Sequence, residues 1–208
     1  MTPPTRRADA QAQHRRALLD AARDIVGREG YGARLDDIAG QAGLTTGAVY
    51  SVFGSKDDLL LALIVDDMAA QEQAVADEAG NSPLLEDAVR AYARTAFRSS
   101  AGAQGRRRLR LDTQIQDMAL RDPRHWEQLR VGIAAQAAQL AALFAGRLCR
   151  DDIVTQAQAL RLARALEALV SGLRRARVLG VEQMDEALFI DSAVALAAPS
   201  VLAPADPV

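Results

Sequence analysis

The segment from Leu35 to Lys56 carries side chains suited to docking in a nucleic-acid groove rather than to catalysis. Small or hydroxyl-bearing residues dominate its second half. Hydroxyls can hydrogen-bond bases or phosphates, and an alanine methyl can meet a thymine methyl. The lysine that closes the segment would hold a phosphate together with the backbone amides of a following helix. The residues that we predict to contact DNA are Arg34, Thr45, Thr46, Gly47, Ala48, Tyr50 and Lys56.

To present those side chains, the chain needs two short helices joined by a tight turn. Ile38 and Ala39 lie on one face of the first helix, and the small Ala39 lets a second helix cross close above it. Gly43 stands where the chain turns, because glycine adopts the left-handed conformation without a clash. Thr45 can cap the second helix by accepting a hydrogen bond from an amide two or three residues on. With Val49 facing inward, this spacing predicts a helix-turn-helix; a tight turn inside an ordinary helical bundle is the alternative.

Patterns typical of enzymes do not occur in the sequence. His14 and His125 are the only histidines and Cys149 is the only thiol. There is no zinc-protease HExxH, P-loop, dinucleotide-binding GxGxxG or nucleophile elbow. Aspartate pairs such as Asp36-Asp37 point apart on a helix and so form no catalytic dyad. We therefore predict a protein that is not an enzyme and has no cofactor or metal site, with His125 as a helix-start residue or, alternatively, a ligand contact.

Composition and charge place few other limits on the class of protein. The 208 residues include 25 Lys+Arg and 27 Asp+Glu, and half of them are apolar, which is a globular balance. Residues 1–56 carry 8 basic and 6 acidic side chains (+2), whereas the rest carry 17 and 21 (−4), so the N-terminal part is the better polyanion binder. A single cysteine favours a cytoplasmic location, and no apolar run approaches the roughly 18 residues of a membrane span.

The hydrophobic periodicity indicates an all-α fold of about nine helices, because apolar residues recur at three and four nearly everywhere. Glycine, proline and aspartate mark the breaks between the predicted helices. The predicted helices span about 10–29, 35–42, 45–52, 55–78, 84–100, 106–119, 123–147, 151–179 and 184–198.

Residues 30–60 resemble the DNA-binding signature of the tetracycline-repressor (TetR) family. The matching positions are Asp37-Ile38-Ala39, Ala42-Gly43-Leu44-Thr45, Gly47, Val49-Tyr50, Phe53, Ser55-Lys56 and Leu59-Leu60. The resemblance implies an N-terminal three-helix head followed by a helical bundle that binds a ligand and forms a dimer. The implied divisions are a flexible arm at 1–9, the DNA-binding domain at 10–54, the effector-binding and dimerisation domain at 55–198, and a flexible tail at 199–208.

The resemblance also implies a function: a ligand-responsive transcriptional repressor. Such a homodimer would bind a palindromic operator in double-stranded DNA and be released by a small lipophilic effector. The alternative is a helical bundle that binds a small molecule or a protein without binding DNA.

Two positions depart from the family pattern. Ala33-Arg34 replaces the usual capping serine or threonine, and the second short helix lacks Arg, Asn and Gln, so specificity would rest on Thr46, Tyr50, DNA shape, Arg34 or the Arg6-Arg7 arm.

The remaining predicted site residues follow from this implied architecture. The predicted ligand contacts are Tyr92, Phe97, Ile115, Met118, Trp126, Leu129 and Phe144, with plain core packing as the alternative for each. The predicted dimer contacts are Leu162, Leu166, Leu169, Leu173, Phe189 and Val194, and the alternative is that these stripes face the core of one subunit. The basic run Arg106–Arg110 is predicted to be a solvated face, or else to pair with acids of the DNA-binding head or an anionic effector.

Overall fold

The computed structural model confirms an all-α protein. It describes residues 6–198 and 202, and the side chains of these residues except 6–8 and 31. The predicted tail therefore lies outside the described residues apart from Leu202, as do the first five residues of the predicted arm. Within the described range the elements are α1 (Arg6–Glu29), the 3-10 helix η1 (Gly30–Gly32), α2 (Leu35–Gln41), α3 (Thr46–Phe53), α4 (Lys56–Ala79), α5 (Leu85–Ser99), α6 (Gly102–Arg121), α7 (Pro123–Phe144), β1 (Leu148–Cys149), β2 (Asp152–Ile153), α8 (Gln156–Val178) and α9 (Glu186–Leu196).

The chain divides into two compact units. The head unit consists of Met1–Asp67 and Arg107–Trp126, and the body unit consists of Met68–Arg106 and Glu127–Val208. Helices α4, α6 and α7 contribute residues to both units. In the described part of the chain, no helix combines the length and apolar character needed to cross a lipid bilayer.

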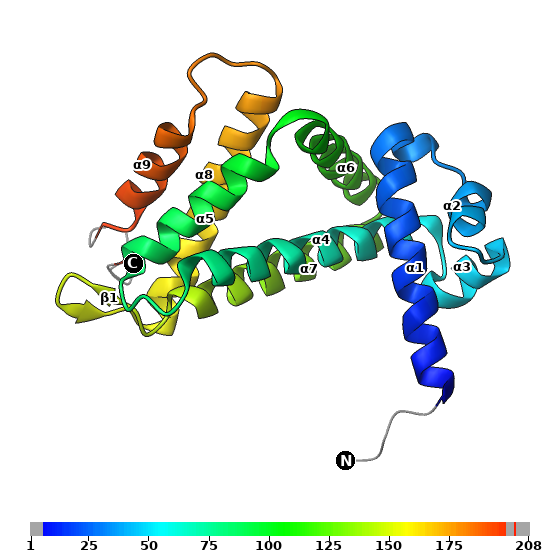
Figure 1. The fold of residues 1–208 in the computed structure, drawn as a ribbon, viewed down its shortest axis with the longest axis horizontal. Coiled ribbons are helices and arrows are strands. Elements are labelled where there is room, and N and C mark those ends of the chain that lie inside the picture. The colour runs from blue at the N-terminus through cyan, green and yellow to red at the C-terminus, as the bar shows by residue number, and fades with distance from the viewer. Residues whose placement is uncertain (1–5, 199–201, 203–208) are drawn as a thin grey trace. The chain divides into compact units, whose positions relative to one another are not determined.

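The head unit is built around α1, which packs against both α2 and α3, while α2 also packs against α3 (Figure 1). The apolar stripe of α1, including Leu18, Ala22 and Ile25, is buried. This helix is also tied to α4 by charge. Arg23 Nε donates to Asp67 Oδ1 at 2.8 Å and Nη2 donates to Asp66 Oδ2 at 2.5 Å. The middle of α4, where its head-unit part ends, is thus held directly on α1.

The body unit has its own core, in which α5 packs against α8 and α9 (Figure 1). Its largest fully buried side chains include Phe144, Leu166 and Phe189. Phe97 meets Phe189 edge-to-face with ring centroids 5.4 Å apart. The guanidinium of Arg177 lies over the Phe97 ring, 3.6 Å from its centroid. It also donates a hydrogen bond to the Phe97 carbonyl. Arg177 of α8 thus contacts both the ring and the backbone of Phe97 near the C-terminal end of α5.

Three predicted helix starts were wrong by four or five residues. Helices α1 and α6 each begin four residues before the predicted start, at Arg6 and at Gly102. Helix α8 begins at Gln156 rather than at 151, because Thr155 and Gln158 form a capping box that fixes the first turn there. The residues between α7 and α8 pair instead as a hairpin of β1 with β2, with Arg150 in the left-handed region at φ 56°. Strands of two residues are too short to show an alternating pattern.

Candidate functional site

The turn between α2 and α3 has the geometry that the sequence predicts. Gly43 adopts φ +69°, and the Leu44 amide donates to the Ala39 carbonyl at 2.9 Å, which closes the turn. Thr45 is the N-cap of α3, and its Oγ1 accepts a hydrogen bond from the Ala48 amide at 3.3 Å. Ala39 and Val49 are buried beneath this turn. The two short helices are therefore fixed relative to each other by backbone bonds, a cap and a small apolar contact.

Helix α3 presents an exposed surface with small and hydroxylated side chains. Tyr50 is 55% exposed, and Gly47 is exposed one turn before it. A Cβ added at Gly47 would meet only Thr45 Oγ1, at an ordinary 3.7 Å. Nothing within this chain therefore requires glycine at this position. Because Gly47 has no side chain, an external partner has room to approach the backbone of α3.

The hydroxyl of Thr46, one of the predicted DNA contacts, forms a hydrogen bond within the head unit. Thr46 Oγ1 donates its proton to Asp36 Oδ1 at 2.6 Å, which joins the start of α3 to the start of α2. Arg34 Nη2 lies 3.6 Å from Asp36 Oδ2, so this exposed arginine belongs to the same polar group. Arg34 is also the N-cap position of α2 and makes no side-chain capping bond, as its residue type predicts. The acidic Asp36 and Asp37 occupy the first turn of α2, where the helix dipole favours them.

The start of α4 lies just after α3 and carries both signs of charge. Ser55 Oγ accepts from the Asp58 amide at 3.0 Å and donates to Asp58 Oδ2 at 2.6 Å, so one of the amides predicted for a phosphate is already capped. Lys56 is half-buried, and desolvation lowers its pKa from the usual value while the charge of Asp57 opposes that change. His125 Nε2 approaches Asp57 Oδ2 to 3.9 Å.

The basic run on α6 has two environments. A Cβ added at Gly27 would lie 2.8 Å from Arg107 Cδ, so the Arg107 side chain lies directly against α1. Arg106 and Arg110 are exposed, and Arg108 Nε is 4.0 Å from Asp112 Oδ2 on the same helix. Part of the run is therefore a solvated face, and Arg107, although exposed, lies against α1.

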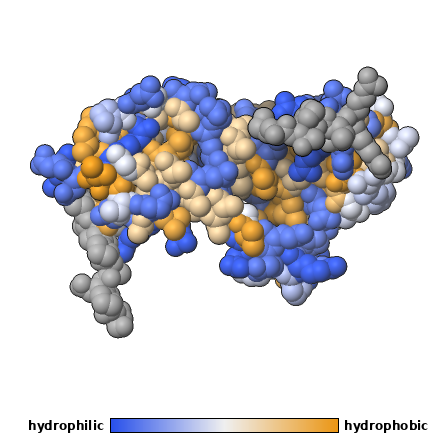
Figure 2. Space-filling view, turned by 90° about the horizontal axis from the view of Figure 1, so that it is seen from below, coloured by the Kyte–Doolittle hydropathy of each residue, from blue (hydrophilic) through white to orange (hydrophobic). Residues whose placement is uncertain are grey.

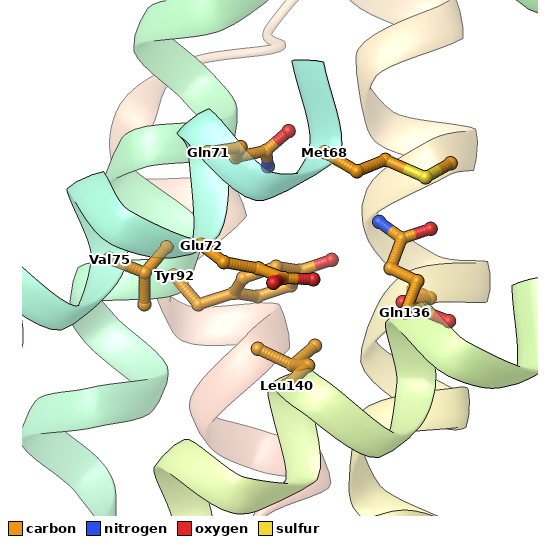
Figure 3. A pocket seen from close by; sticks show the side chains of 8 residues that line it. Met68, Gln71, Glu72, Val75, Tyr92, Gln136 and Leu140 are labelled. Atoms are coloured by element: carbon orange, nitrogen blue, oxygen red, sulfur yellow. The ribbon is translucent and has the colours of Figure 1, made fainter. Parts of the chain in front are cut away.

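The body unit contains a small cavity that is partly open to solvent, and the roughly 230 Å³ of space there that no atom fills includes open solvent. Four helices line it with Met68, Gln71, Glu72, Val75, Tyr92, Gln136, Leu140 and Glu167. Figure 3 shows Glu72 of α4 and Tyr92 of α5 extending toward the side of the cavity where Gln136 of α7 lies. The lining thus combines apolar walls with two carboxyl groups, two amides and a phenol.

The charge of the cavity is unusual because its two carboxyl groups lie within electrostatic reach of each other. Burial, and after it the negative charge of Glu72, raises the pKa of Glu167 to about 7, against the opposing charges of Arg174 and Arg164. Burial also raises the pKa of Glu72. Arg174 Nη1 donates to Gln71 Oε1 at 3.3 Å. Near pH 7 Glu167 is therefore protonated in about half of the molecules.

Of the predicted ligand contacts, Tyr92 lines this cavity. Phe144 is fully buried in the body core, and Phe97 packs between Phe189 and Arg177, which fits the core-packing alternative for both. Leu129 is half-buried in the body unit. The other predicted contacts belong to the head unit: Ile115 is buried, Met118 is half-buried and Trp126 is 52% exposed.

The sequence prediction missed both cavity carboxylates, although a signal was present. Glu72 falls between Met68 and Val75 on the stripe of α4 that faces inward, and Glu167 follows the buried Leu166 on α8. An acidic residue on the apolar stripe of a helix is a reason to expect a site, because a carboxylate is rarely placed inside a core without a role.

The predicted dimer contacts divide into two groups. Leu162, Leu166 and Phe189 have no exposed surface in a single chain, so they pack the body core and have no surface left to offer a second subunit. Leu169, Leu173 and Val194 are only partly buried. Exposed apolar residues do remain on the surface, and Figure 2 shows them as orange areas among blue polar ones.

The raised pKa of Glu167 predicts that its replacement by glutamine stabilises the free protein at high pH. A carboxyl group whose pKa is raised on folding favours the folded state below its unfolded pKa of about 4.5 and loses that contribution as pH rises through about 7. We expect Glu167→Gln to leave the free energy of unfolding nearly unchanged at pH 5 and to raise it by about 1–2 kcal/mol at pH 8, allowing for partial solvent exposure. Denaturant unfolding at the two pH values measures the difference. A variant that is less stable at pH 8 would contradict the prediction.

Comparison with known proteins gives the sequence and fold a context. Residues 18–63 match the family model for bacterial regulatory proteins of the tetR family. No curated protein matches the sequence. A solved structure of a candidate TetR-family transcriptional regulator from Rhodococcus sp. is 18% identical, with a TM-score of 0.68, and the match covers 92% of this chain and 100% of that one.

Two other solved structures of similar fold contain small molecules. A candidate transcriptional regulator from Saccharomonospora viridis in complex with choline is 18% identical, with a TM-score of 0.63 and coverage of 89% of this chain and 95% of that one. The multidrug binding protein EbrR, complexed with imidazole, is 25% identical, with a TM-score of 0.61 and coverage of 93% and 97%.

Proposed function

We propose that this chain is a DNA-binding transcriptional repressor of the tetR family, whose model its residues 18–63 match, and that a small molecule controls it. The observation that carries the proposal is the capped, glycine-closed turn between α2 and α3, with the open surface of α3 beside it. Such a helix enters the major groove and reads base edges with its first residues. Thr45, Thr46, Gly47, Ala48 and Tyr50 supply that surface.

The protein acts as a homodimer on a palindromic duplex. One head covers only a half-site, and two heads about 34–36 Å apart meet successive major grooves on one side of the DNA. Because α3 lacks arginine and amide side chains, direct base contacts are few. Specificity then rests on Thr46, Tyr50 and the shape of the duplex. The exposed Arg34 adds a contact to the backbone or to the minor groove.

A ligand in the body cavity regulates DNA binding. Its effect on operator affinity equals its differential affinity for the DNA-binding and released conformations. The choline and imidazole complexes of two proteins of similar fold support a ligand-binding role for this chain. We assign such a ligand to the body cavity, whose polar groups can contact it.

Selection of duplexes from a random library tests the proposal. We expect the full-length protein to enrich a palindrome, here called the operator, and to shift it in a gel with two subunits per duplex. Enrichment of no sequence, together with equal and weak binding to all duplexes, would instead favour a ligand-binding bundle that does not act on DNA.

Lys56 is predicted to position the head on the phosphate backbone rather than to read sequence. Its replacement by alanine should weaken the operator and random DNA by similar factors, because every duplex presents phosphates. The slope of log K against log salt should fall by about 1 for each head, and so by about 2 for a dimer on both half-sites. Fluorescence anisotropy over a salt series measures this slope.

The matched control for Lys56→Ala removes one positive charge from the body unit. Arg130 is exposed on α7 and pairs with Glu127 at 2.6 Å, so Arg130→Ala should leave the slope unchanged. If Lys56→Ala also leaves the slope unchanged, Lys56 does not contact a phosphate.

A further inference from the structure

The body cavity contains acceptors that the protein itself does not satisfy. The Oε1 atoms of Glu72 and Glu167 are both buried and have no hydrogen-bond partner in the structure. A buried polar atom without a partner costs free energy, and a carboxylate costs more than a neutral group. Both atoms belong to residues that line the same cavity, and they come from different helices, α4 and α8. A ligand with hydrogen-bond donors could therefore satisfy both oxygens.

The charges around the cavity favour a positive occupant. Glu72 and Glu167 repel each other, and the positive charges that act on Glu167 are those of Arg174 and Arg164. Arg174 is directed to Gln71, whose Oε1 it binds at 3.3 Å. An anion placed here would meet two carboxyl groups, whereas a cation would relieve their repulsion and supply donors to their oxygens.

The rest of the lining indicates an organic cation rather than a metal ion. Among the described residues, no group of three or more His, Cys, Asp or Glu side chains is placed to hold a metal. Val75 and Leu140 give apolar walls, and Tyr92 adds an aromatic ring that is almost wholly buried. Such walls bind the body of a ligand, and a few polar groups at one end fix its orientation. Met68 can change rotamer to admit a larger body.

We propose that Glu72 and Glu167 together bind the cationic group of a small organic molecule that carries N–H donors on a compact apolar body, and that this class of molecule is the effector. The assignment as effector rests on the proposed regulatory function, whereas the binding site itself does not. In the free protein Glu167 carries a proton below about pH 7. Where that proton is present the ligand displaces it, and the ligand supplies its own N–H groups to the two unpartnered oxygens.

Proton displacement gives the site a distinctive pH dependence. Below about pH 7 Glu167 is protonated, so a cation must expel the proton before it can bind. Affinity should therefore rise between pH 6 and pH 8 and level off above. Binding near pH 7 should release protons, which calorimetry detects as a dependence of the heat on the ionisation enthalpy of the buffer.

The test uses benzamidinium as the probe and benzamide, which has nearly the same shape and no charge, as its control. Isothermal titration of the full-length protein at pH 8 should show at least about tenfold tighter binding of benzamidinium than of benzamide. Butylammonium and butan-1-ol form a second pair with a flexible body. Tetramethylammonium, a cation without N–H donors, should bind less tightly than butylammonium.

Variants assign the binding to the carboxyl pair. Glu72→Gln and Glu167→Gln should each weaken benzamidinium by about tenfold or more, and the second should also remove the rise of affinity with pH. Glu182→Gln removes the same charge from an exposed loop of the body unit and should bind as the unchanged protein does. Circular dichroism and thermal melts verify that the variants fold.

Each outcome separates the site from the regulatory role. If no cation binds more tightly than its neutral partner, or if the two glutamine variants bind as well as the unchanged protein, the proposed site is wrong whatever the DNA assays show. If benzamidinium binds through Glu72 and Glu167 but leaves operator affinity unchanged at saturation, the site stands and the effector class is wrong. If no operator is found at all, the regulatory function fails while the calorimetric result still decides the site.

Discussion

Replacing Gly47 with glutamate is expected to abolish operator binding while leaving the fold and the oligomeric state unchanged. Gly47 lies in the first turn of α3, and a side chain there meets only an ordinary contact within the chain. An acidic residue near a helix N-terminus is also favourable to the helix. Against DNA, however, the carboxylate would face phosphates at the closest point of approach. Because like charges brought together cost several kcal/mol, we expect a loss of at least about 100-fold, or about 3 kcal/mol.

Two comparisons make that result specific to the docking surface. Gly132→Glu adds the same charge to α7 of the body unit, at a position where a Cβ meets nothing within 4 Å, and should bind the operator normally. Gly47→Ala adds bulk without charge and should lose much less affinity than the glutamate variant. Anisotropy titrations and circular dichroism on all three proteins are sufficient. Retained operator binding by Gly47→Glu would show that the head docks through another surface.

The second large effect concerns two substitutions on α8, one at a buried and one at an exposed position, which we expect to have different consequences. Leu166 is fully buried in the body core, so Leu166→Ala should lower the free energy of unfolding by about 2–5 kcal/mol through lost contacts and a cavity. Gly172 is exposed on a neighbouring face of the helix, about 120° away around the axis, and a Cβ there meets open space. Ala165, Leu169 and Ala176 share its face at helical spacing. Gly172→Arg should fold normally and block a second subunit.

Light scattering and unfolding measured together distinguish the two α8 variants. Gly172→Arg is expected to be monomeric and to lose most of its operator affinity, because one head contacts only a half-site. A helix interior favours arginine over glycine, so the monomer should not lose stability from the change itself. Unfolding must be compared over a range of protein concentrations, because dimerisation adds to apparent stability. A dimeric Gly172→Arg protein would place the interface on a different face.

The local geometry of the head was predictable because short-range chemistry determines it. Gly43 is at a left-handed turn because other residues are strained there, and the Thr45 hydroxyl caps α3 because no helical carbonyl can reach that amide. Both effects act over three or four residues and are visible in the sequence. The same applies to Arg34, whose side chain makes no capping bond.

The cavity could not be predicted in the same way, because its residues are brought together by packing over long separations. Glu72 and Glu167 are 95 positions apart, and only the contact of α4 with other helices of the body unit makes them neighbours. The prediction chose ligand contacts by aromatic character, and two of those side chains pack the core instead. A buried leucine is similarly ambiguous in the sequence. Leu162, Leu166 and Leu169 share a stripe, yet the first two face the core of their own chain.

The half-buried Lys56 at the start of α4 also gives the head a chemical handle. It is the only lysine among the 208 residues, so reagents that acylate side-chain amines have a single target. Desolvation lowers its pKa, which increases the fraction of nucleophilic free amine at mildly alkaline pH. Acylation at this position would cancel a positive charge on the proposed DNA-contacting surface, and bound DNA would shield the amine from the reagent. The extent of Lys56 acylation, read by mass spectrometry, would therefore serve as a footprint of operator occupancy that requires no engineered label.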